Sequence, residues 1–477
     1  TGADAFIGSV EYLASADVKT TVNNIRAFED GDKVFLQTIY NFAGAGEQVA
    51  FDIFRFDGDG KIAEHWDNLA ALAERGEYSF KSFFTPGMLF EAFRFAYIGP
   101  VDGHDIPALR HHLEMAASVE DGPVLLHVHT KKGHGFAPAE KDPTHYHGVG
   151  HFDPETGMFL PKKSTAPSFT SVFGKAAVEL GKKDSRIVVI TAAMPDGTGT
   201  IYFQKARPDH FFDVGICEQH AVTFAAGLAS QGARPLVCIY STFLQRAYDQ
   251  VVHDVCLQNL PVVFCIDRAG LVGEDGATHQ VAYLRHIPNM HCLAPRDENM
   301  LVRCLTTAVA LGKPCSVRYP RGAAFGVEVQ PDPKPLPYGK GEIVQEGEKV
   351  AILALGSSLH AACDAADEVH MRLGFMPLVF DPIWIKPLPE EQIADIFRRF
   401  DKILTVEESS LAGGFGSAVL EYASDHGLLA GKTVKRLGVP DRFIEHASQA
   451  QQRHELGLDV EGIYRAVEEL AGGTETA

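Results

Sequence analysis

One acidic residue, Glu218, stands where a strand gives way to a helix. Residues 212–229 read FDVGICEQHAVTFAAGLA, and apolar side chains recur there at helical spacing, at Cys217, Ala221, Phe224, Ala225 and Leu228. This spacing predicts a helix whose first turn holds Glu218, directly after a loop at 213–215. A carboxylate in a first turn complements the helix dipole. At the end of a buried strand-helix unit, it also stands where α/β proteins bind ligands.

Three arginines lie in loop-like segments of a chain whose net charge is −19: Arg246, Arg268 and Arg321. The planar guanidinium group forms paired hydrogen bonds with phosphate oxygens, so a cluster of such side chains suits a phosphomonoester. Taken one at a time, each arginine is better explained as a member of a surface ion pair. The sequence therefore indicates a phosphate site only if the fold brings the three together.

Histidines near carboxylates are candidates for proton transfer. Asp275 and His279 lie in the segment GEDGATH at 273–279, and such a histidine can exchange protons near neutral pH. The same Asp-Gly pair also fits a simple turn. We interpret His145 and His147 as solvated loop residues and expect no metal site, because no third ligand follows at a spacing typical of zinc.

Runs of β-branched and other apolar residues predict the strands that would position these side chains. Four runs alternate with helical stretches in the middle of the chain, at 186–190, 235–240, 261–266 and 315–319. The pattern predicts an α/β fold with a doubly wound parallel sheet, covered by helices on both faces. It resumes at 350–355, 378–380 and 402–407, which indicates a second, smaller α/β domain.

The N-terminal region has a different texture. Alternating runs at 33–40, 49–56 and 61–66 are separated by the turn clusters EDGD and DGDG, which predicts an antiparallel meander. A unit of helix and strand then ends at 124–129, and alternate prolines between 331 and 337 mark a linker. The expected segments are 1–70, 80–165, 166–325, a linker at 326–344, and 345–477.

The composition excludes several functional classes. With 477 residues, 45% hydrophobic and 22% charged, the chain is globular and long enough for about two to four domains. Its net charge of −19 argues against a nucleic-acid binder, and the absence of a long apolar run argues against a membrane span. The 8 cysteines form no CxxC pair and lie mostly in apolar runs, so we expect buried free thiols in a reducing compartment.

Longer motifs connect these residues to a known family. The segments that carry the resemblance are GPVDGHD at 99–105, TKKGHG at 130–135, EQH at 218–220, YSTFLQRAYDQ at 240–250, DRAG at 267–270 and YPRG at 319–322. They closely resemble those of the 1-deoxy-D-xylulose-5-phosphate synthases, thiamine-diphosphate enzymes of the transketolase superfamily. The resemblance runs from about residue 80 to about residue 470, with the motifs in the family's order.

The resemblance implies a cofactor site around Glu218. This side chain would hydrogen-bond N1′ of the cofactor's aminopyrimidine and so promote the tautomer that removes the proton from thiazolium C2. Phe243 would stack on the pyrimidine ring, and Ile216 would contact the cofactor. Outside this motif, Phe243 would be read as an ordinary core residue that follows a strand.

The resemblance also implies a substrate site. Arg268 and Arg321 would hold the phosphate of glyceraldehyde 3-phosphate, with Tyr240 and Arg246 nearby. Four further positions match polar active-site residues of the family: Asp275, His279, Lys132 and His147. The C-terminal domain, of the transketolase C-terminal type, would mainly support subunit contacts, and we assign no catalytic residue to it.

The implied activity is that of a transferase. Pyruvate loses CO2 and condenses with glyceraldehyde 3-phosphate to give 1-deoxy-D-xylulose 5-phosphate, a precursor of isoprenoids and thiamine. The implied cofactors are thiamine diphosphate and Mg²⁺, and the implied assembly is a homodimer, without nucleic acid or membrane as partner. The expected location is the cytoplasm, or the plastid stroma in a eukaryote.

Two segments depart from the family's pattern. The family's first domain carries a Gly-Asp-Gly motif and, about thirty residues later, an Asn, which hold Mg²⁺ against the diphosphate. Here Gly58-Asp59-Gly60 lies between two predicted strands and Asn68 follows after only eight residues, so we interpret the triplet as a hairpin turn. The loop after His279 is also a few residues shorter than in the family.

Residues 1–70 instead resemble the last strands of a SnoaL-like or ketosteroid-isomerase-like α+β domain, in which Asp67 would be the candidate base. Only about half of such a domain is present, so we favour a fusion, a gene-assembly fault or a structural remnant over a second catalytic unit. The first residues, TGADAF, are interpreted as an internal start without a signal peptide. Three alternatives to a self-sufficient enzyme stay open: a non-catalytic homologue, one component of a split enzyme, and a structural dimerisation protein.

Overall fold

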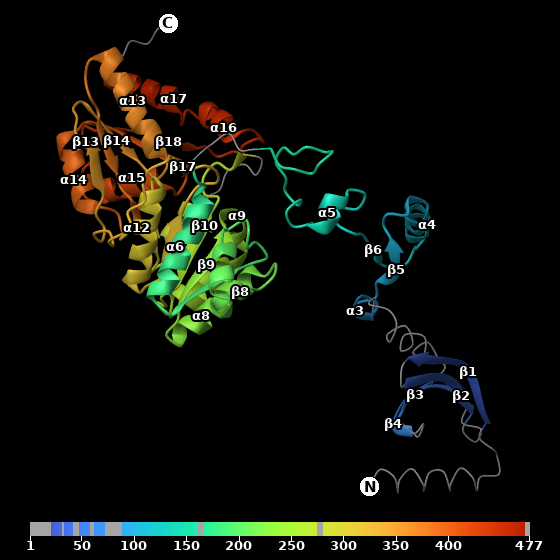
Figure 1. Cartoon of the computed structure of the whole chain (residues 1–477). Helices are drawn as coiled ribbons and strands as arrows, with labels where there is room; N and C mark the ends of the chain where they lie inside the picture. The colour runs from blue at the N-terminus through green and yellow to red at the C-terminus, as the bar shows by residue number, and fades with distance from the viewer. Residues whose placement is uncertain are drawn as a thin grey trace. The chain divides into compact units, whose positions relative to one another are not determined.

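The chain divides into two compact units, Thr1–Pro161 and Lys162–Ala477 (Figure 1). The structure is a computed structural model that describes residues 21–30, 33–41, 47–57, 62–71, 88–160, 166–273 and 280–472. None of the helices in these ranges combines the length and the apolar character that a membrane span requires.

The first unit begins with an antiparallel sheet in the order β1-β2-β3-β4. Its strands are β1 (Thr21–Asp30), β2 (Lys33–Asn41), β3 (Glu47–Phe56) and β4 (Ile62–Ala71). Each strand pairs with the next one along the chain, which confirms the predicted meander. Phe56 pairs with Ile62, in agreement with a hairpin between β3 and β4, although Gly58-Asp59-Gly60 itself lies outside the described residues. Asp67 and Asn68 are residues of β4.

A second part of this unit contains two parallel strands and the helix that connects them. Its elements are α3 (Met88–Ala92), β5 (Ala96–Asp102), α4 (Ile106–Ala117), β6 (Val124–His129) and α5 (Ala137–Lys141). The helix α4 begins at Ile106 because the Asp105 side chain accepts the N–H of Ala108 at 3.0 Å, which caps the first turn. β5 and β6 pair in parallel, so this part is a β-α-β unit.

The second unit contains a mixed sheet in the order β16-β11-β12-β10-β9-β7-β8. Its strands are β7 (Ile187–Thr191), β8 (Phe211–Asp213), β9 (Arg234–Tyr240), β10 (Val263–Asp267), β11 (His291–Leu293), β12 (Cys315–Arg318) and β16 (Trp384–Lys386). All neighbours pair in parallel except β16 with β11, which confirms the predicted parallel sheet. The sequence does not predict β16, which the C-terminal region contributes to this sheet with Trp384 fully buried.

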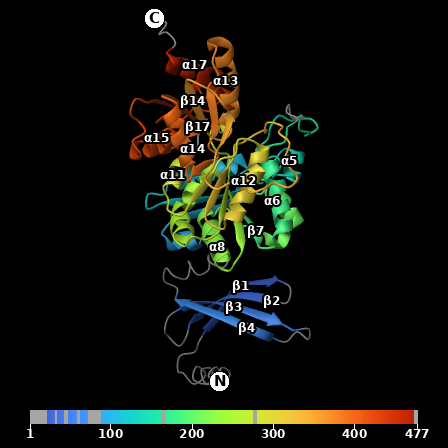
Figure 2. The same cartoon turned by 90° about the vertical axis from the view of Figure 1, so that its left-hand side faces the viewer.

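Helices cover both faces of this sheet, as predicted (Figure 2). They are α6 (Phe169–Lys183), α7 (Ile201–Ala206), η1 (Pro208–His210), α8 (Glu218–Ser230), α9 (Ser241–Leu244), η2 (Gln245–Ala247), α10 (Tyr248–Gln250), the π-helix η3 (Val251–Cys256), α11 (Gln280–Arg285) and α12 (Glu298–Leu311). Apolar residues of α6, α7 and α12 share one core with one face of the strands, and those of α8, η3 and α11 share another with the opposite face. Because alternate residues of a strand point to opposite faces, each buried strand contributes side chains to both cores.

The smaller α/β region has a sheet in the order β13-β15-β14-β17-β18. Its elements are β13 (Glu342–Gln345), β14 (Val350–Ala354), α13 (Ser358–Leu373), β15 (Leu378–Asp381), α14 (Glu390–Arg399), β17 (Lys402–Ser410), α15 (Phe415–Asp425), β18 (Thr433–Val439), α16 (Gln449–Glu455) and α17 (Val460–Ala471). One of its faces packs against α13 and α17, and the other belongs to the same core as α8. The two α/β regions therefore share apolar packing.

The cysteines confirm only part of the expectation. All 8 are free, but Cys217 is exposed and Cys363 is half-buried. The helical spacing predicts Cys217 on the apolar face of the helix, and this prediction is wrong. The residue precedes the first turn of α8 as its N-cap, where the backbone has left the helical path.

Two helix glycines give opposite expectations for stability. A Cβ on Gly174 in α6 would lie 2.3 Å from the carbonyl oxygen of Gly199, so this glycine permits close packing. We expect Gly174→Ala to lower the free energy of unfolding by about 2 kcal/mol, measured by thermal denaturation. Gly227→Ala in α8 is the matched control, since nothing lies within 4 Å of its added Cβ. It should stabilise by up to about 1 kcal/mol, and equal effects of the two variants would contradict this packing.

Candidate active site

Glu218 is the first residue of α8, as predicted, and its side chain is 3% exposed. The loop before it is fixed by Asp213 Oδ1, which accepts the N–H groups of Ala193 at 2.8 Å and Gly215 at 3.0 Å. The ionic partner of Glu218 is Arg246, whose Nη1 atom donates to Glu218 Oε1 at 3.3 Å. A buried carboxylate is costly without a partner. The pair therefore keeps an acid in a nearly dry position.

Arg246 also begins a stack of four side chains. Its guanidinium group lies 5.3 Å from the centre of the Phe243 ring. The rings of Phe243 and Tyr240 are nearly parallel, with centres 5.9 Å apart and an angle of 17°. The guanidinium group of Arg268 lies 4.0 Å from the centre of the Tyr240 ring. Cations are attracted to aromatic faces, so these contacts connect Glu218 to Arg268.

A buried acid, Asp267, ends β10 directly before Arg268. Its Oδ2 accepts a hydrogen bond from Thr170 Oγ1 at 2.7 Å, whereas Oδ1 is buried without a hydrogen-bond partner. Burial raises the pKa of this carboxyl to about 7, against the opposing effects of the Thr170 hydrogen bond and the charges of Arg268 and Arg321. Burial also raises the pKa of Tyr240, and the charge of Arg268 opposes that shift.

Arg321 shares this environment. Its charge acts on the pKa values of both Asp267 and Tyr240, and its Nη1 donates to the carbonyl oxygen of Val272 at 2.9 Å. Arg268 and Arg321 follow β10 and β12, which pair in parallel. The carboxyl ends of parallel strands form the edge of the sheet where α/β proteins bind ligands. The fold therefore brings the predicted arginines to one region.

The remaining predicted residues differ in their surroundings. Ile216, two residues before Glu218, is 76% exposed, which leaves its side chain available to a ligand or partner. Lys132 and His147 belong to the unit Thr1–Pro161, in which both are exposed. Asp275 and His279 lie outside the described residues. Within the described ranges, no three His, Cys, Asp or Glu side chains form a group that could hold a metal ion.

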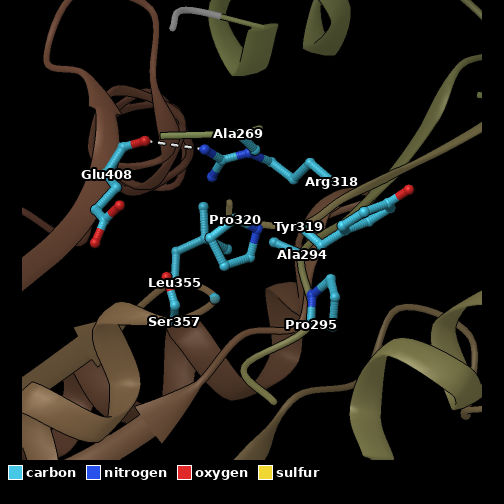
Figure 3. A pocket seen from close by; sticks show the side chains of 10 residues that line it. Ala269, Ala294, Pro295, Arg318, Tyr319, Pro320, Leu355, Ser357 and Glu408 are labelled. Atoms are coloured by element: carbon cyan, nitrogen blue, oxygen red, sulfur yellow. Dashed lines mark hydrogen bonds between the residues drawn. The ribbon is translucent and has the colours of Figure 1, made fainter. Parts of the chain in front are cut away.

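A small pocket lies where the two α/β regions of the second unit meet (Figure 3). Ala269 and Pro320 line it, and they are the chain neighbours of Arg268 and Arg321. The lining combines apolar side chains with polar ones, and Arg318 Nη2 donates to the carbonyl oxygen of Glu408 at 2.9 Å. The pocket therefore lies at the boundary between the two α/β regions, directly beside the segments that contain Arg268 and Arg321.

Sequence reasoning does not single out several residues of this region. Asp267 has a detectable signal, because an acid between a buried strand and an arginine is unusual in residue type and place. Three residues of the smaller α/β region bond to the backbone of the loop 271–273: Glu408, Gln449 and Gln452. A glutamine that binds a distant backbone leaves no pattern in a single sequence, so these contacts emerge only from the fold.

The arrangement has two chemically different ends. At one end, a buried carboxylate can share a proton with a ring nitrogen of a ligand. At the other end, guanidinium groups suit the oxygens of a phosphate. Aromatic faces lie between the two. The cluster therefore fits a nitrogen heterocycle next to a phosphorylated compound.

Three models of known protein families match this chain. The family model described as "Transketolase, pyrimidine binding domain" matches residues 165–325, which include the whole stack. The model "Transketolase, C-terminal domain" matches residues 339–463. The model "1-deoxy-D-xylulose-5-phosphate synthase" matches residues 50–130, which include most of β3 and all of β4.

Curated relatives are similar over most of the chain. The 1-deoxy-D-xylulose-5-phosphate synthase of Nitratidesulfovibrio vulgaris (strain DP4) is 55% identical over 419 residues, which are 86% of this chain and 65% of the relative. That of Lawsonia intracellularis is 53% identical over 404 residues, covering 83% of this chain and 63% of the relative. The chain thus spans about 65% of the length of these relatives.

A solved structure is similar as well. It is titled "Split gene transketolase, inactive beta4 tetramer", and it matches with a TM-score of 0.56 and 29% identity, over 64% of this chain and 98% of that one. The three family models, the curated relatives and this structure all point to the same group. The chain belongs to the 1-deoxy-D-xylulose-5-phosphate synthase family of the transketolase superfamily.

Proposed function

We propose that this chain acts in the synthesis of 1-deoxy-D-xylulose 5-phosphate. The reaction is the decarboxylative condensation of pyruvate with glyceraldehyde 3-phosphate, a transferase reaction of the transketolase type that supplies isoprenoid and thiamine precursors. The observation that carries this proposal is the stack from Arg246 to Arg268, which joins a buried carboxylate to a pair of arginines. Each end matches one of the two chemical tasks of this reaction.

Thiamine diphosphate is the proposed cofactor, and the described residues fit its pyrimidine end. A carboxyl that is 3% exposed is available for a ring nitrogen. The exposed aliphatic side chain of Ile216 lies two residues before it in the chain, and the Phe243 ring contacts Arg246, the ionic partner of Glu218. When bound, the cofactor would stabilise the negative charge that decarboxylation of pyruvate leaves on carbon. We assign Glu218, Phe243 and Ile216 to the cofactor.

Glu218 would hold a proton at the ring nitrogen N1′. Arg246 donates to Oε1 of this carboxyl. In a site that excludes water, a carboxyl shares such a proton more effectively than in bulk solvent. Arg246 would keep the carboxyl oriented while its own guanidinium group remains stacked on Phe243.

Arg268 and Arg321 would bind the phosphate of the aldehyde substrate, with Tyr240 beside them. Binding the phosphate would fix the position of the aldehyde carbon, which is the part of the substrate that reacts. We assign Asp275 to substrate binding. The proposed proton carriers are His279, His147 and Lys132. These four assignments rest on the motif match.

A Mg²⁺ ion would accompany the cofactor's diphosphate, and we assign no described residue to it. The proposed assembly is a homodimer, and the free thiols suit the reducing environment of a cytoplasm. The proposed segments are 1–70, 80–165, 166–325, 326–344 and 345–477.

The similarity to a split-gene transketolase chain favours a second candidate. In that arrangement, a separate polypeptide would supply the diphosphate and metal part of the site. The residues assigned above would keep the same roles. The two candidates differ in whether the chain binds the cofactor alone or only with an added domain.

The assignment of Glu218 predicts a change in cofactor affinity. Glu218→Gln keeps the size of the side chain but cannot share its proton in the same way, so the affinity for thiamine diphosphate with Mg²⁺ should fall about tenfold or more, measured by calorimetry. Glu390→Gln, an exposed first-turn acid of α14, is the matched control and should bind like the wild type. Equal affinity of Glu218→Gln and wild type would contradict the assignment.

The assignment of the arginines predicts a loss of phosphate binding. Arg268→Met and Arg321→Met should each weaken the binding of glycerol 3-phosphate by about tenfold or more, because each removes charged hydrogen bonds to the phosphate. Arg186→Met removes an exposed ion pair with Asp184 and serves as the control. Calorimetric titration gives the affinities, and unchanged binding in both site variants would refute the phosphate site.

The buried acid beside these arginines makes stability depend on pH. Folding raises the pKa of Asp267 from 3.8 to about 7, so the folded protein binds this proton more tightly than the unfolded chain. Stability is therefore lost as the pH rises between these two values. Asp267→Asn removes this titration while its side-chain oxygen can still accept the Thr170 hydrogen bond.

We expect the stability gain of Asp267→Asn over the wild type to be larger at pH 8 than at pH 5. The increase should be on the order of 2 kcal/mol, measured from thermal denaturation at both pH values. Asp209→Asn, an exposed acid of η1, should behave alike at both. A gain from Asp267→Asn that does not grow with pH would contradict the proposed environment of this carboxyl.

A further inference from the structure

The loop 271–273 is buried, although it belongs to no long strand or helix. Leu271 and Val272 are 0% exposed, and Gly273 is buried as well. Backbone N–H and C=O groups that are withdrawn from water need hydrogen-bond partners. In this loop, side chains supply them, and most come from the smaller α/β region.

Gln452 of α16 holds Gly273 at two points. Its Nε2 donates to the carbonyl oxygen of Gly273 at 2.8 Å, and its Oε1 accepts the N–H of Gly273 at 3.0 Å. Nε2 also donates to the carbonyl oxygen of Glu445 at 3.0 Å, which fixes the plane of the amide. The Gln452 side chain is 0% exposed, so water cannot easily replace these bonds.

Gln449, three residues earlier on the same helix, connects the loop to Arg321. Its Nε2 donates to the carbonyl oxygen of Leu271 at 2.6 Å and to that of Arg321 at 3.4 Å. The Arg321 side chain returns to the loop, because its Nη1 donates to the carbonyl oxygen of Val272. The backbone of Arg321 and the loop are thus held together by one helix.

Glu408 of β17 holds the other side of the loop. Its Oε2 accepts the N–H of Leu271 at 3.3 Å, and its Oε1 accepts a hydrogen bond from Arg453 of α16 at 2.6 Å. A Cβ on Gly270 would lie 2.6 Å from Glu408 Oε2, so the chain can approach this carboxylate only because residue 270 is glycine. The backbone carbonyl oxygen of Glu408 also accepts a hydrogen bond from Arg318, which is visible in Figure 3.

The loop 271–273 lies between Arg268 and a segment that contains two further predicted site residues. It follows Arg268 by three residues and leads directly into the segment 274–279, which contains Asp275 and His279. A helix that fixes 271–273 and the carbonyl group of Arg321 therefore sets the spacing of the two arginines. It also sets the point from which the next segment departs.

We propose that Gln452 is a positioning residue of the phosphate site, and that Gln449 and Glu408 assist it. Through them the smaller α/β region determines where Arg268 and Arg321 stand, a role beyond support of subunit contacts. The effect on phosphate binding rests on the proposed function. The rigidity of the loop does not, and it can be measured separately.

The test uses Gln452→Met, which keeps the length of the side chain and removes its hydrogen bonds. Hydrogen exchange of the peptides that cover 268–273 should become at least tenfold faster, while exchange in the central strand β10 stays as in the wild type. The affinity for glycerol 3-phosphate should fall about tenfold, since small displacements of a binding group are costly. Calorimetry measures this second effect.

Gln451→Met is the matched control on the same helix. Gln451 is exposed and completes the capping box of α16 with Ser448, so its loss weakens the helix end without removing a bond to the loop. It should leave exchange at 268–273 and the affinity unchanged. If both variants affect the loop equally, the clamp is refuted, because general loss of α16 would then explain the result.

Gln452→Glu adds a readout that a merely space-filling residue would not give. A protonated carboxyl can both donate and accept, whereas an ionised one faces the carbonyl oxygens of Gly273 and Glu445 without a proton. Loop protection in Gln452→Glu should therefore fall with rising pH relative to the wild type, and protection that does not depend on pH would contradict the clamp. If Gln452→Met does not fold, Gln449→Met supplies the same exchange test.

Two results decide between the inference and the proposed function. If the wild type does not bind glycerol 3-phosphate, the phosphate assignment fails, while faster loop exchange in Gln452→Met still supports the clamp. If loop exchange and affinity in Gln452→Met both match those of the wild type, the positioning role is overturned.

Discussion

The arrangement of the site depends on the ion pair that offsets the cost of burying one carboxylate. Glu218 is almost withdrawn from water at the start of α8, and Arg246 offsets the cost of burying its charge. The guanidinium group that does so is held over Phe243, which packs on Tyr240, and this ring carries Arg268. A single electrostatic requirement thus connects the loop before α8 to the ends of β9 and β10.

The smaller α/β region is part of this architecture. It contributes β16 to the larger sheet, shares an apolar core with α8, and satisfies the backbone of the loop 271–273. Buried loops are rare because their polar groups are hard to satisfy. Here the satisfaction comes from glutamine side chains of α16, which makes the geometry near the arginines depend on a distant stretch of sequence.

Much of the fold could be predicted from the sequence. The runs predicted at 186–190, 235–240 and 261–266 largely coincide with β7, β9 and β10 of the parallel sheet. The first-turn position of Glu218 follows from helical spacing. Local periodicity could not predict β16, because a strand that joins another region's sheet is set by tertiary packing. It also misplaced Cys217, since spacing alone cannot locate the residue at which a helix begins.

The candidate site, too, could be predicted only in part. Residue type and motif indicated Glu218, Phe243 and the arginines, but not that stacking joins them, because stacking depends on side-chain directions. The environment of Asp267, with its raised pKa, depends on burial and on Thr170, which lies 97 residues away. Such long-range partners leave no trace in a single sequence.

A crystal structure of the chain with thiamine diphosphate and Mg²⁺ would show whether Glu218 binds the pyrimidine ring. We expect a Glu218 carboxyl oxygen to lie about 2.6–3.2 Å from the pyrimidine nitrogen N1′, with the Arg268 and Arg321 guanidinium groups facing the same cavity. A cofactor bound elsewhere, or a Glu218 side chain that contacts no atom of the pyrimidine ring, would contradict it.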